Sequence, residues 1–484
     1  MGLLNHGMES LSIKGRRSSN ASSAHEEVGE GDDTSQLDKE EGNVLMTIIS
    51  QLRPGMDLTK IALPTFVLEP RSLLERVTDF FSHPELVFGA GKIDDPMERF
   101  MKVMTMYLSG WHIKPKGVKK PYNPVICEFY RCSYTYEDGS QGYYLAEQVS
   151  HHPPISAFFY CSPKNNILVT GELVPKSKFL GNSAATIMEG EDRIRLLDRP
   201  EDGEYCISMP NTYARGIMFG KLVLELCEMS SIVCAKNDIR ADIDFKAKGW
   251  ISGGYNAIAG PVKHKRQTVG EVTGHWNSVI EYTDAATHKR SVIFDANGAK
   301  SVPKSVLPES EQEPQESRRL WANLTTAIKS GDMHGATAEK NIVEERQRDL
   351  ARKREAEGKS HELRFFKNVG GNKYMPKLDV DNLPKDQAEM EKVIRSFVYG
   401  SADKASGASS SPPASAPMVA DPSSRSSRSD SSPQSTLAPG GVASASSSVS
   451  NLSNASTAEP PAIPTAPGPP APGPKADHPI GPAV

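Results

Sequence analysis

The stretch VICEFYRCSYTYEDGSQGYYLAEQVSHHPPISAFFYC, residues 125–161, consists of three strand-like runs separated by short turns. Each run is rich in β-branched and aromatic residues, and a Glu-Asp-Gly turn separates the first two, which is typical of antiparallel hairpins. Further runs of this kind follow at intervals of about 8 to 12 residues as far as residue 276. A meander of so many strands closes into a barrel that is too wide for side chains alone to fill. The sequence therefore predicts a large, near-complete antiparallel β-barrel with a cavity inside it.

Helical patterns flank this strand-rich region. Residues 44–52 place their apolar side chains on one stripe, and a helix this short must lie on an apolar surface to be stable. A second helix is predicted from Pro70 to about residue 83, and a third over residues 95–110, where Asp95 is an N-cap followed by proline. Beyond residue 318 the sequence becomes helical and charged. We therefore expect a mainly β fold with flanking helices (α+β), including a C-terminal helical layer against the barrel.

The composition changes near both ends of the chain of 484 residues. Residues 26–41 carry eight acidic residues against one lysine, and the last part is Ser, Ala, Pro and Gly with few aromatic residues. Such segments cannot bury enough apolar surface to offset the loss of chain entropy. We therefore expect four parts: a disordered acidic segment at 1–42, a short helical segment at 43–62, the barrel domain with its C-terminal helices at 63–400, and a disordered Ser/Pro/Ala-rich tail at 401–484.

Composition also bears on location and on partners. No apolar run reaches the ~18 residues needed to cross a bilayer, and the N-terminus lacks the layout of a signal peptide. The six cysteines form no CxxC pattern, which favours buried, reduced thiols in a cytosolic protein. The formal net charge of −4 shows no overall basic excess, so we do not expect a nucleic-acid partner.

A lysine-rich segment precedes the first strand. KPKGVKKPYNP, residues 114–124, carries four lysines within seven positions and is bounded by prolines. Lysines on a loop need no reason other than solvation, so a solvated surface is one interpretation. The other is a phosphate site, because prolines hold the loop in a fixed shape that presents ammonium groups such as Lys120 and the amide of Asn123.

Two adjacent histidines, His151 and His152, end the second run in EQVSHHPP, residues 147–154. In an extended strand they would point to opposite faces and could not easily share a metal ion, and no HExxH or CxxC pattern supplies further zinc ligands. A nucleophile elbow is also missing, because GNSAA at residues 181–185 lacks the second glycine of GxSxG. Two interpretations remain: histidines hydrogen-bonded at a barrel rim, or imidazoles that donate to a polyanionic headgroup and gain charge beside its phosphate.

A third set of polar residues lies on a predicted helix. Lys340, Glu344 and Arg348 follow one another at i,i+4 spacing in AEKNIVEERQR. Two surface ion pairs, worth roughly 0.2–0.5 kcal/mol each, would explain this spacing when it is taken alone.

Together these three sets resemble the signature of the oxysterol-binding-protein-related lipid-transfer family. EQVSHHPP is similar to the family's fingerprint, and KPYNP at residues 120–124 and the helix spacing match its other headgroup-binding elements. The resemblance covers roughly residues 44–375. It implies a β-barrel that encloses one lipid in a tunnel, closed by a lid helix at residues 44–52. It also implies that the headgroup of phosphatidylinositol 4-phosphate is bound by Lys120, Asn123, His151, His152, Lys340, Glu344 and Arg348.

A finer resemblance concerns the second lipid. LPTFVLEPRSLLER, residues 63–76, is similar to the phosphatidylserine-transferring subgroup rather than to sterol-carrying members. It implies that the serine headgroup or the glycerol contacts Leu63, Thr65, Asn123 and Ser177. One departure from the family pattern stands at Cys127, where the Leu-Gly-Glu-like run that follows KPYNP has glycine. The resemblance therefore does not predict the backbone path of residues 123–128, called the headgroup loop below.

The resemblance implies a lipid-transfer protein that is not an enzyme and needs no cofactor. It would extract phosphatidylserine and exchange it for phosphatidylinositol 4-phosphate between membranes. The expected location is cytoplasmic and peripheral, at contacts between endoplasmic reticulum and plasma membrane, where a tether protein is a candidate partner. Two alternatives stay open: a carrier of sterol and phosphatidylinositol 4-phosphate, and a lipid sensor or scaffold whose tail recruits partners.

Overall fold

The computed structural model describes residues 34–36, 50, 52–57, 64–114, 118–217, 221–248 and 254–400. The predicted tail at 401–484 lies outside these residues, and so do Leu63, all of segment 1–42 except residues 34–36, and most of segment 43–62, including most of the expected lid helix. Within the N-terminal segment one short strand is described, β1 (Thr34–Gln36), and it pairs with β12.

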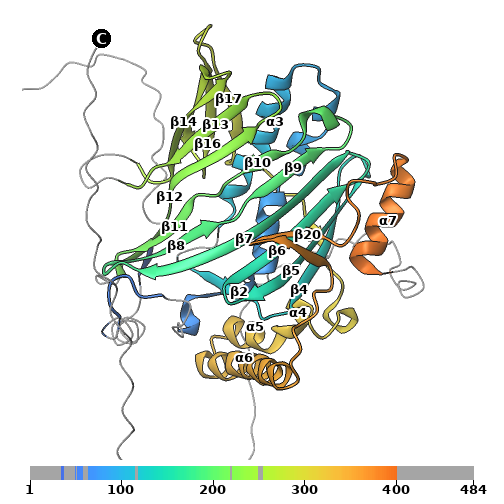
Figure 1. Ribbon diagram of the computed structural model, residues 1–484. Helices are drawn as coiled ribbons and strands as arrows, with labels where there is room; N and C mark the ends of the chain where they lie inside the picture. Colours follow the sequence, from blue (N-terminus) through green and yellow to red (C-terminus); the bar gives the residue numbers. More distant parts are fainter. Residues whose placement is uncertain are drawn as a thin grey trace, which may run out of the picture. The chain divides into compact units, whose positions relative to one another are not determined.

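A sheet of 16 strands dominates the described residues (Figure 1). Its main path runs in the order β17-β16-β15-β14-β13-β12-β10-β9-β7-β6-β5-β4-β18, with antiparallel pairing from strand to strand. Its strands after β1 are β4 (Phe129–Thr135), β5 (Gln141–His151), β6 (Pro154–Ser162), β7 (Ile167–Phe179), β8 (Ser183–Glu189), β9 (Asp192–Leu196), β10 (Tyr205–Ile207), β11 (Asn211–Arg215), β12 (Lys221–Cys234), β13 (Ile239–Phe245), β14 (Ala257–His264), β15 (Gln267–His275), β16 (Val279–Asp284), β17 (Arg290–Asp295) and β18 (Lys304–Ser305). The sheet curves through most of a barrel with β17 and β18 at its two edges, so the predicted near-complete antiparallel barrel is confirmed.

Strands β7 and β12 run past two separate pairs of shorter strands. Residues 167–171 of β7 pair with β9, and residues 174–179 pair with β8. Residues 232–234 of β12 pair with β10, and residues 223–227 pair with β11. Because β9 pairs with β10 and β8 pairs with β11, the wall between β7 and β12 consists of two independent strand pairs, one toward each end.

Both faces of β5 and β6 are buried, which explains their almost continuous apolar sequence. Tyr144 and Phe158 belong to the apolar cluster on the concave face, together with helical residues between 74 and 108. Leu145 and Phe159 belong to a second cluster, together with residues of α7 (Gln387–Tyr399) on the opposite face. The alternation of side chains along each strand therefore builds two cores, one on each side of the sheet.

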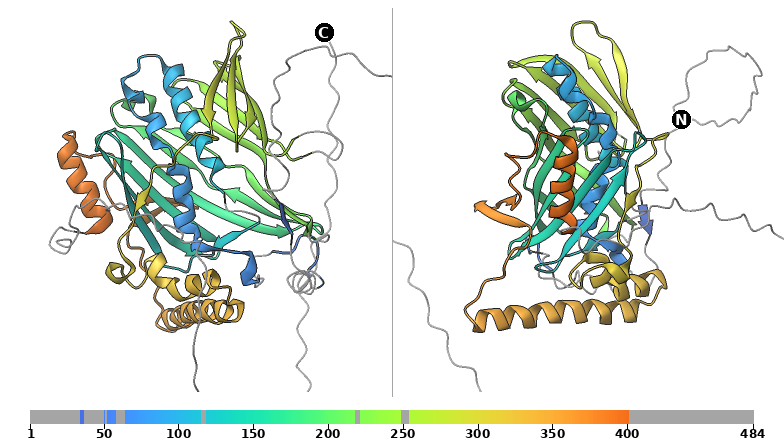
Figure 2. Two further views of the ribbon diagram at one scale, coloured as in Figure 1. Left: turned by 180° about the vertical axis from the view of Figure 1, so that it is seen from behind. Right: turned by 90° about the vertical axis from the view of Figure 1, so that its right-hand side faces the viewer.

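Helical segments lie against the concave face of the sheet (Figure 2). α3 (Pro96–Ser109) begins at the N-cap Asp95, whose carboxylate accepts a hydrogen bond from the Met97 amide, as predicted. The prediction of one continuous helix from Pro70 to about residue 83 is wrong, because residues 68–72 form a strand, after which the chain forms a four-residue helix followed by a 3-10 helix. Packing decides this conformation, since a helix so short has little stability of its own. These segments are α2 (Leu73–Arg76) and η3 (Val77–Phe81), followed by η4 (Pro84–Val87), η5 (Ala90–Lys92) and η6 (Gly110–His112).

The predicted C-terminal helical layer is present at one end of the sheet (Figure 1). It consists of α4 (Ser317–Leu320), α5 (Ala322–Lys329) and α6 (Met333–Ala356), and the hairpin of β19 (Phe366–Gly370) and β20 (Lys373–Pro376) leads from it to α7. Here η2 (Thr65–Val67) leads into β2 (Leu68–Ser72), which runs parallel to β3 (Lys120–Tyr122). Tyr122 packs on Trp321 with ring centroids 5.2 Å apart, so the lysine-rich segment is anchored on the helical layer. Of the helices described, none has both the length and the apolar character that crossing a bilayer requires.

Candidate functional site

His151 and His152 meet at the end of β5. Nδ1 of His151 lies 3.2 Å from Nε2 of His152, and the rings stand almost perpendicular with centroids 4.6 Å apart. The expectation that the two rings point to opposite faces is therefore wrong. β5 ends at His151 and β6 begins at Pro154, so His152 already belongs to the turn and does not follow the alternation of the strand.

The environment of His151 disfavours its protonated form. Burial of the half-buried ring lowers its pKa, the neighbouring His152 lowers it further, and Glu344 acts in the opposite direction. Glu344 on α6 is thus close enough to act on His151 electrostatically. An anion arriving beside this pair would reverse the balance, because a negative charge favours the imidazolium.

Lys120 and Lys340 bring two positive charges to the same region. The pKa of Lys120 is lowered, first by burial and second by the charge on Lys340, although the Lys120 side chain keeps contact with solvent. Nζ of Lys340 lies 2.8 Å from Oε1 of Glu344. A single anion could satisfy both ammonium groups, which repel each other without it.

Five of the seven residues expected to bind the phosphoinositide headgroup therefore form one connected group, called the headgroup cluster below: Lys120, His151, His152, Lys340 and Glu344. Asn123 follows Lys120 at an exposed position just beyond β3. Arg348 is exposed and pairs with Glu345 at 2.7 Å, so the expected i,i+4 pair with Glu344 is not observed. The roles of Asn123 and Arg348 toward a ligand stay predictions. Within the described ranges, no three His, Cys, Asp or Glu side chains are arranged to hold a metal ion.

The residues expected to contact phosphatidylserine lie at the same end of the sheet. Thr65 is buried in η2, and its Oγ1 lies 3.5 Å from Oγ1 of Thr337 on α6. Ser177 is in the second half of β7, with its Oγ 3.4 Å from Oγ1 of Thr186 on β8. Phe66, next to Thr65, packs against the cluster of Ile217 and Leu222, against which Ala184 of β8 also packs. Leu63 is not among the described residues, so its contribution stays a prediction.

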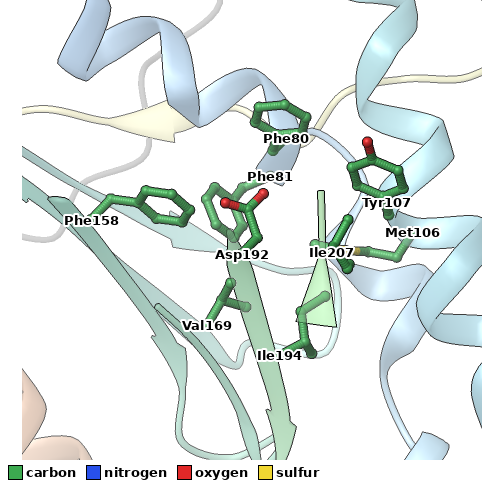
Figure 3. Close-up of a pocket in the computed structure, with 9 residues that line it drawn as sticks. All are labelled: Phe80, Phe81, Met106, Tyr107, Phe158, Val169, Asp192, Ile194 and Ile207. Atoms are coloured by element: carbon green, nitrogen blue, oxygen red, sulfur yellow. The ribbon is translucent and has the colours of Figure 1, made fainter. Parts of the chain in front are cut away.

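A small pocket with a cavity volume of about 20 Å³ lies on the concave side of the sheet (Figure 3). It is lined by Phe80, Phe81, Met106, Tyr107, Phe158, Val169, Asp192, Ile194 and Ile207. Burial raises the pKa of Asp192 to about 8, and Oδ1 of this carboxyl has no hydrogen-bond partner among the described residues. The carboxyl is therefore mostly protonated at neutral pH, which leaves the lining uncharged and suited to hydrocarbon.

Comparison with known proteins identifies the family. The model of the oxysterol-binding protein family matches residues 47–387. The chain belongs to the oxysterol-binding protein family. It is similar to the oxysterol-binding protein-like protein OBPa of Candida albicans, with 46% identity over 335 residues that cover 69% of this chain and 77% of that protein.

Two solved structures resemble this oxysterol-binding protein domain. The Osh1 ORD domain in complex with cholesterol matches with a TM-score of 0.56 and 25% identity, over 70% of this chain and 86% of that one. The Osh3 ORD of Saccharomyces cerevisiae in complex with PI(4)P matches with a TM-score of 0.56 and 20% identity, over 75% of this chain and 95% of that one. Members of the oxysterol-binding protein family bind and transfer lipids, which confirms the expectation that the chain is not an enzyme.

The oxysterol-binding protein domain keeps its headgroup loop despite the departure at Cys127. This residue has a φ of 65°, which glycine adopts freely and which costs a residue with a side chain about 1–2 kcal/mol. The backbone is nevertheless held, because the Cys127 amide donates to the Gln148 carbonyl at 3.3 Å and the Gln148 amide donates to the Glu128 carbonyl at 2.8 Å. The glycine expected from the family resemblance is thus explained by backbone geometry.

Glu128 supports this loop, and the sequence analysis did not single it out. The side chain is fully buried, and burial raises its pKa. Four donors surround its carboxylate: Ser72 Oγ, Ser317 Oγ at 2.7 Å, Trp321 Nε1 at 2.9 Å and the Val125 amide at 3.0 Å. The carboxylate therefore ties β2 and the C-terminal layer to the loop beside Asn123. Its sequence signal is an acidic residue at the start of an apolar strand.

Proposed function

We propose that this oxysterol-binding protein domain extracts phosphatidylserine from one membrane and exchanges it for phosphatidylinositol 4-phosphate from another. The observation that carries the proposal is the headgroup cluster at the rim of a barrel with an uncharged interior pocket. A phosphoinositide has the matching two-part chemistry, a polyanionic headgroup attached to hydrocarbon.

The charge of the headgroup cluster suits a phosphate monoester, which carries about −1.5 to −2 charges at neutral pH. Lys120 and Lys340 supply two ammonium groups, and His151 can gain a proton when the anion arrives. The Osh3 domain, whose fold is similar, was solved in complex with PI(4)P, which supports the same ligand for this chain.

The apolar interior of the barrel explains how a lipid could be moved through water. Each buried CH₂ group is worth about 0.8 kcal/mol, so a diacyl lipid leaves a bilayer only if another apolar environment receives its chains. The pocket has a cavity volume of about 20 Å³, which is far too small for a lipid chain, and α3 and η3 occupy much of the concave face. We infer that loading moves these helical segments apart.

Phosphatidylserine is proposed as the second cargo from the resemblance of residues 63–76 to the serine-lipid subgroup. The contacts of Thr65 support a ligand role, because its hydroxyl makes hydrogen bonds of 3.4–3.5 Å at the long end of the range and can exchange them for a ligand. Competition of the two lipids for one cavity would make the loading of one the release of the other. We propose a cytoplasmic protein that acts peripherally at contacts between endoplasmic reticulum and plasma membrane, with a tether protein as candidate partner.

Native mass spectrometry after incubation with mixed liposomes tests this proposal. The parent chain should carry phosphatidylserine or phosphatidylinositol 4-phosphate, and His151→Ala/His152→Ala should carry phosphatidylserine alone. The variant His264→Ala/His288→Ala, which changes two histidines on the β14–β17 hairpins, should behave as the parent does. Loading of phosphatidylinositol 4-phosphate by the His151→Ala/His152→Ala variant would contradict the site, and failure of the parent to load phosphatidylserine would contradict the cargo.

A sterol carrier is the second candidate, because the similar Osh1 domain was solved with cholesterol and the interior pocket is apolar and aromatic. Sterol bound to the parent chain in the same experiment, in place of phosphatidylserine, would favour it. A lipid sensor or scaffold would instead bind lipid without net transfer between donor and acceptor liposomes.

A further inference from the structure

A second pocket lies on the outer side of the headgroup loop. Its cavity volume is about 40 Å³, and it is formed by residues 125–127, the start of the C-terminal layer and one face of α6. Its apolar walls include Val125, Leu320, Val343 and Leu350, and its charged groups are Arg346 and Arg354. The pocket is separate from the interior pocket, with which it shares no lining residue.

The two arginines of this outer pocket differ from the other arginines of α6. Arg348 pairs with Glu345, and Arg352 pairs with both Glu345 and Asp349. Within the part of the chain that the structure describes, neither Arg346 nor Arg354 has an ion pair or a side-chain hydrogen bond. The chain therefore presents two uncompensated guanidinium groups beside an apolar hollow.

Glu147 acts electrostatically on this pocket, but within the described structure it forms no ion pair with Arg346 or Arg354. Cys127 lines the pocket and interacts electrostatically with Arg354 and with Glu147. The carboxylate of Glu147, however, accepts hydrogen bonds from the backbone amides of residues 364–366, at 2.7, 2.8 and 3.3 Å. Its acceptor capacity is thus largely used, and the pocket keeps its positive character.

The spacing of the arginines suits one compact dianion. A helix rises about 1.5 Å per residue, so Arg346 and Arg354 start ~12 Å apart along the axis, and their long side chains can approach one anion from both ends. Guanidinium groups bind phosphate oxygens through paired hydrogen bonds. We propose that the outer pocket binds a phosphate monoester between Arg346 and Arg354.

This site goes beyond the exchange function, because it needs no lipid in the barrel. It also shares α6 with the headgroup cluster, and its residues 125–127 follow β3, which carries Lys120. The Ile126 amide donates to Oε1 of Gln347 at 3.2 Å, so α6 and the loop are joined at the edge of the pocket. A phosphate held here would contact the loop that carries Asn123 from its outer side.

Isothermal titration of the full chain with inositol 1,4-bisphosphate tests the site. In the His151→Ala/His152→Ala background, which weakens the headgroup cluster, one binding event should remain. Adding Arg346→Ala/Arg354→Ala should weaken it at least about tenfold, as expected for loss of charge-assisted contacts. Arg352→Ala/Lys353→Ala removes two positive charges from the same helix outside the pocket, and it should change the affinity less than about twofold. Equal weakening by both pairs, or no remaining binding event, would overturn the proposal.

Alkylation of Cys127 gives an independent measurement. Because Cys127 lines the pocket, inositol 1,4-bisphosphate should slow its alkylation, whereas Cys206 on β10, which is also half-buried, should react at an unchanged rate. Equal rates at Cys127 with and without the probe would overturn the proposal even if a variant failed to fold.

Vesicles distinguish the two sources of the phosphate. If the site takes a lipid headgroup, Arg346→Ala/Arg354→Ala should reduce binding to phosphatidylcholine vesicles containing phosphatidylinositol 4-phosphate. If it takes only a soluble phosphate ester, vesicle binding should match the parent while the titration still shows the loss. Both results support a phosphate monoester site, and they assign its ligand to one source.

Discussion

Replacing Glu128 by alanine is expected to destabilise the domain by about 3 kcal/mol. The change leaves four donors without their acceptor, in a site from which water is excluded. The two serine hydroxyls can rotate toward other acceptors, but the Val125 amide and the Trp321 indole cannot. Each buried donor left unpaired costs about 1–3 kcal/mol, which gives a range of about 2–6 kcal/mol. Relief of the cost of burying the acid places the expected value in the lower half of that range.

Urea denaturation at pH 7, followed by tryptophan fluorescence, measures this change. Glu128→Gln keeps the volume and one acceptor oxygen and should lose less than Glu128→Ala. Glu309→Ala removes an exposed acid in η9 (Glu309–Glu311) and should stay within about 0.5 kcal/mol of the parent. A loss below about 1 kcal/mol for Glu128→Ala would refute the reasoning, because it would mean that the donors find other partners. Equal losses of unfolding free energy in Glu128→Ala and Glu128→Gln would refute the special role of the carboxylate oxygens.

Three further predictions concern backbone strain and pH. Cys127→Gly removes about 1–2 kcal/mol of left-handed backbone strain and costs about 0.5–1 kcal/mol through the greater entropy of the unfolded chain. The free energy of unfolding should therefore rise slightly. A lower free energy of unfolding in urea denaturation would contradict the strain at Cys127. Asp192 has a folded pKa of about 8, above its unfolded value near 3.8, so its contribution to stability is full below pH 4 and is lost as the pH rises through 8. Between pH 6 and 8 the parent should therefore lose roughly 2 kcal/mol relative to Asp192→Asn in denaturation curves, and parallel curves would argue against a buried neutral acid. The pKa of His151 is lowered in the free protein, so an anion that restores it takes up a proton, and binding of phosphatidylinositol 4-phosphate should tighten as the pH falls from 8 to 6. The slope should flatten in His151→Ala, which keeps His152, and equal slopes in liposome binding would place the proton uptake elsewhere.

The barrel could be predicted because its strands carry strong local signals. β5 and β6 are long, aromatic and bounded by turn residues, and Asp95 caps α3 as its sequence indicates. Pairing was harder to predict. Residues 221–227 and 231–234, which belong to two separate strand-like runs of the sequence, lie in one strand, β12, because the irregular residue Glu228, with a φ of 74°, does not end the ladder. β14 was not predicted as a strand, because it contains Gly260 and Pro261, which are typical of loops.

The headgroup cluster shows the same limit at the level of side chains. The motifs identified the correct residues, but strand alternation placed the rings of His151 and His152 on opposite faces because it did not account for the turn. Helix spacing predicted the pair of Lys340 with Glu344, yet Arg348 could choose between two adjacent glutamates and pairs with Glu345. Glu128 carried almost no signal, because burial and four donors from distant segments cannot be read from one residue in a strand.

A lipid carrier needs a sheet that resists unfolding and a place where lipid can pass, and the two strand pairs between β7 and β12 are suited to different ones of these tasks. The pair of β9 and β10 is mostly buried, whereas β8 and β11 are half-exposed along most of their length. Amide protons should therefore exchange with solvent sooner in β8 and β11 than in β9 and β10. The half-exposed pair lies where Ser177 and the segment at residues 55–57 meet the end of β7, so local opening there would widen one end of the wall. The buried pair of β9 and β10 would meanwhile keep the register of β7 and β12. Entry of a lipid and resistance to unfolding would then depend on different strands of the same sheet.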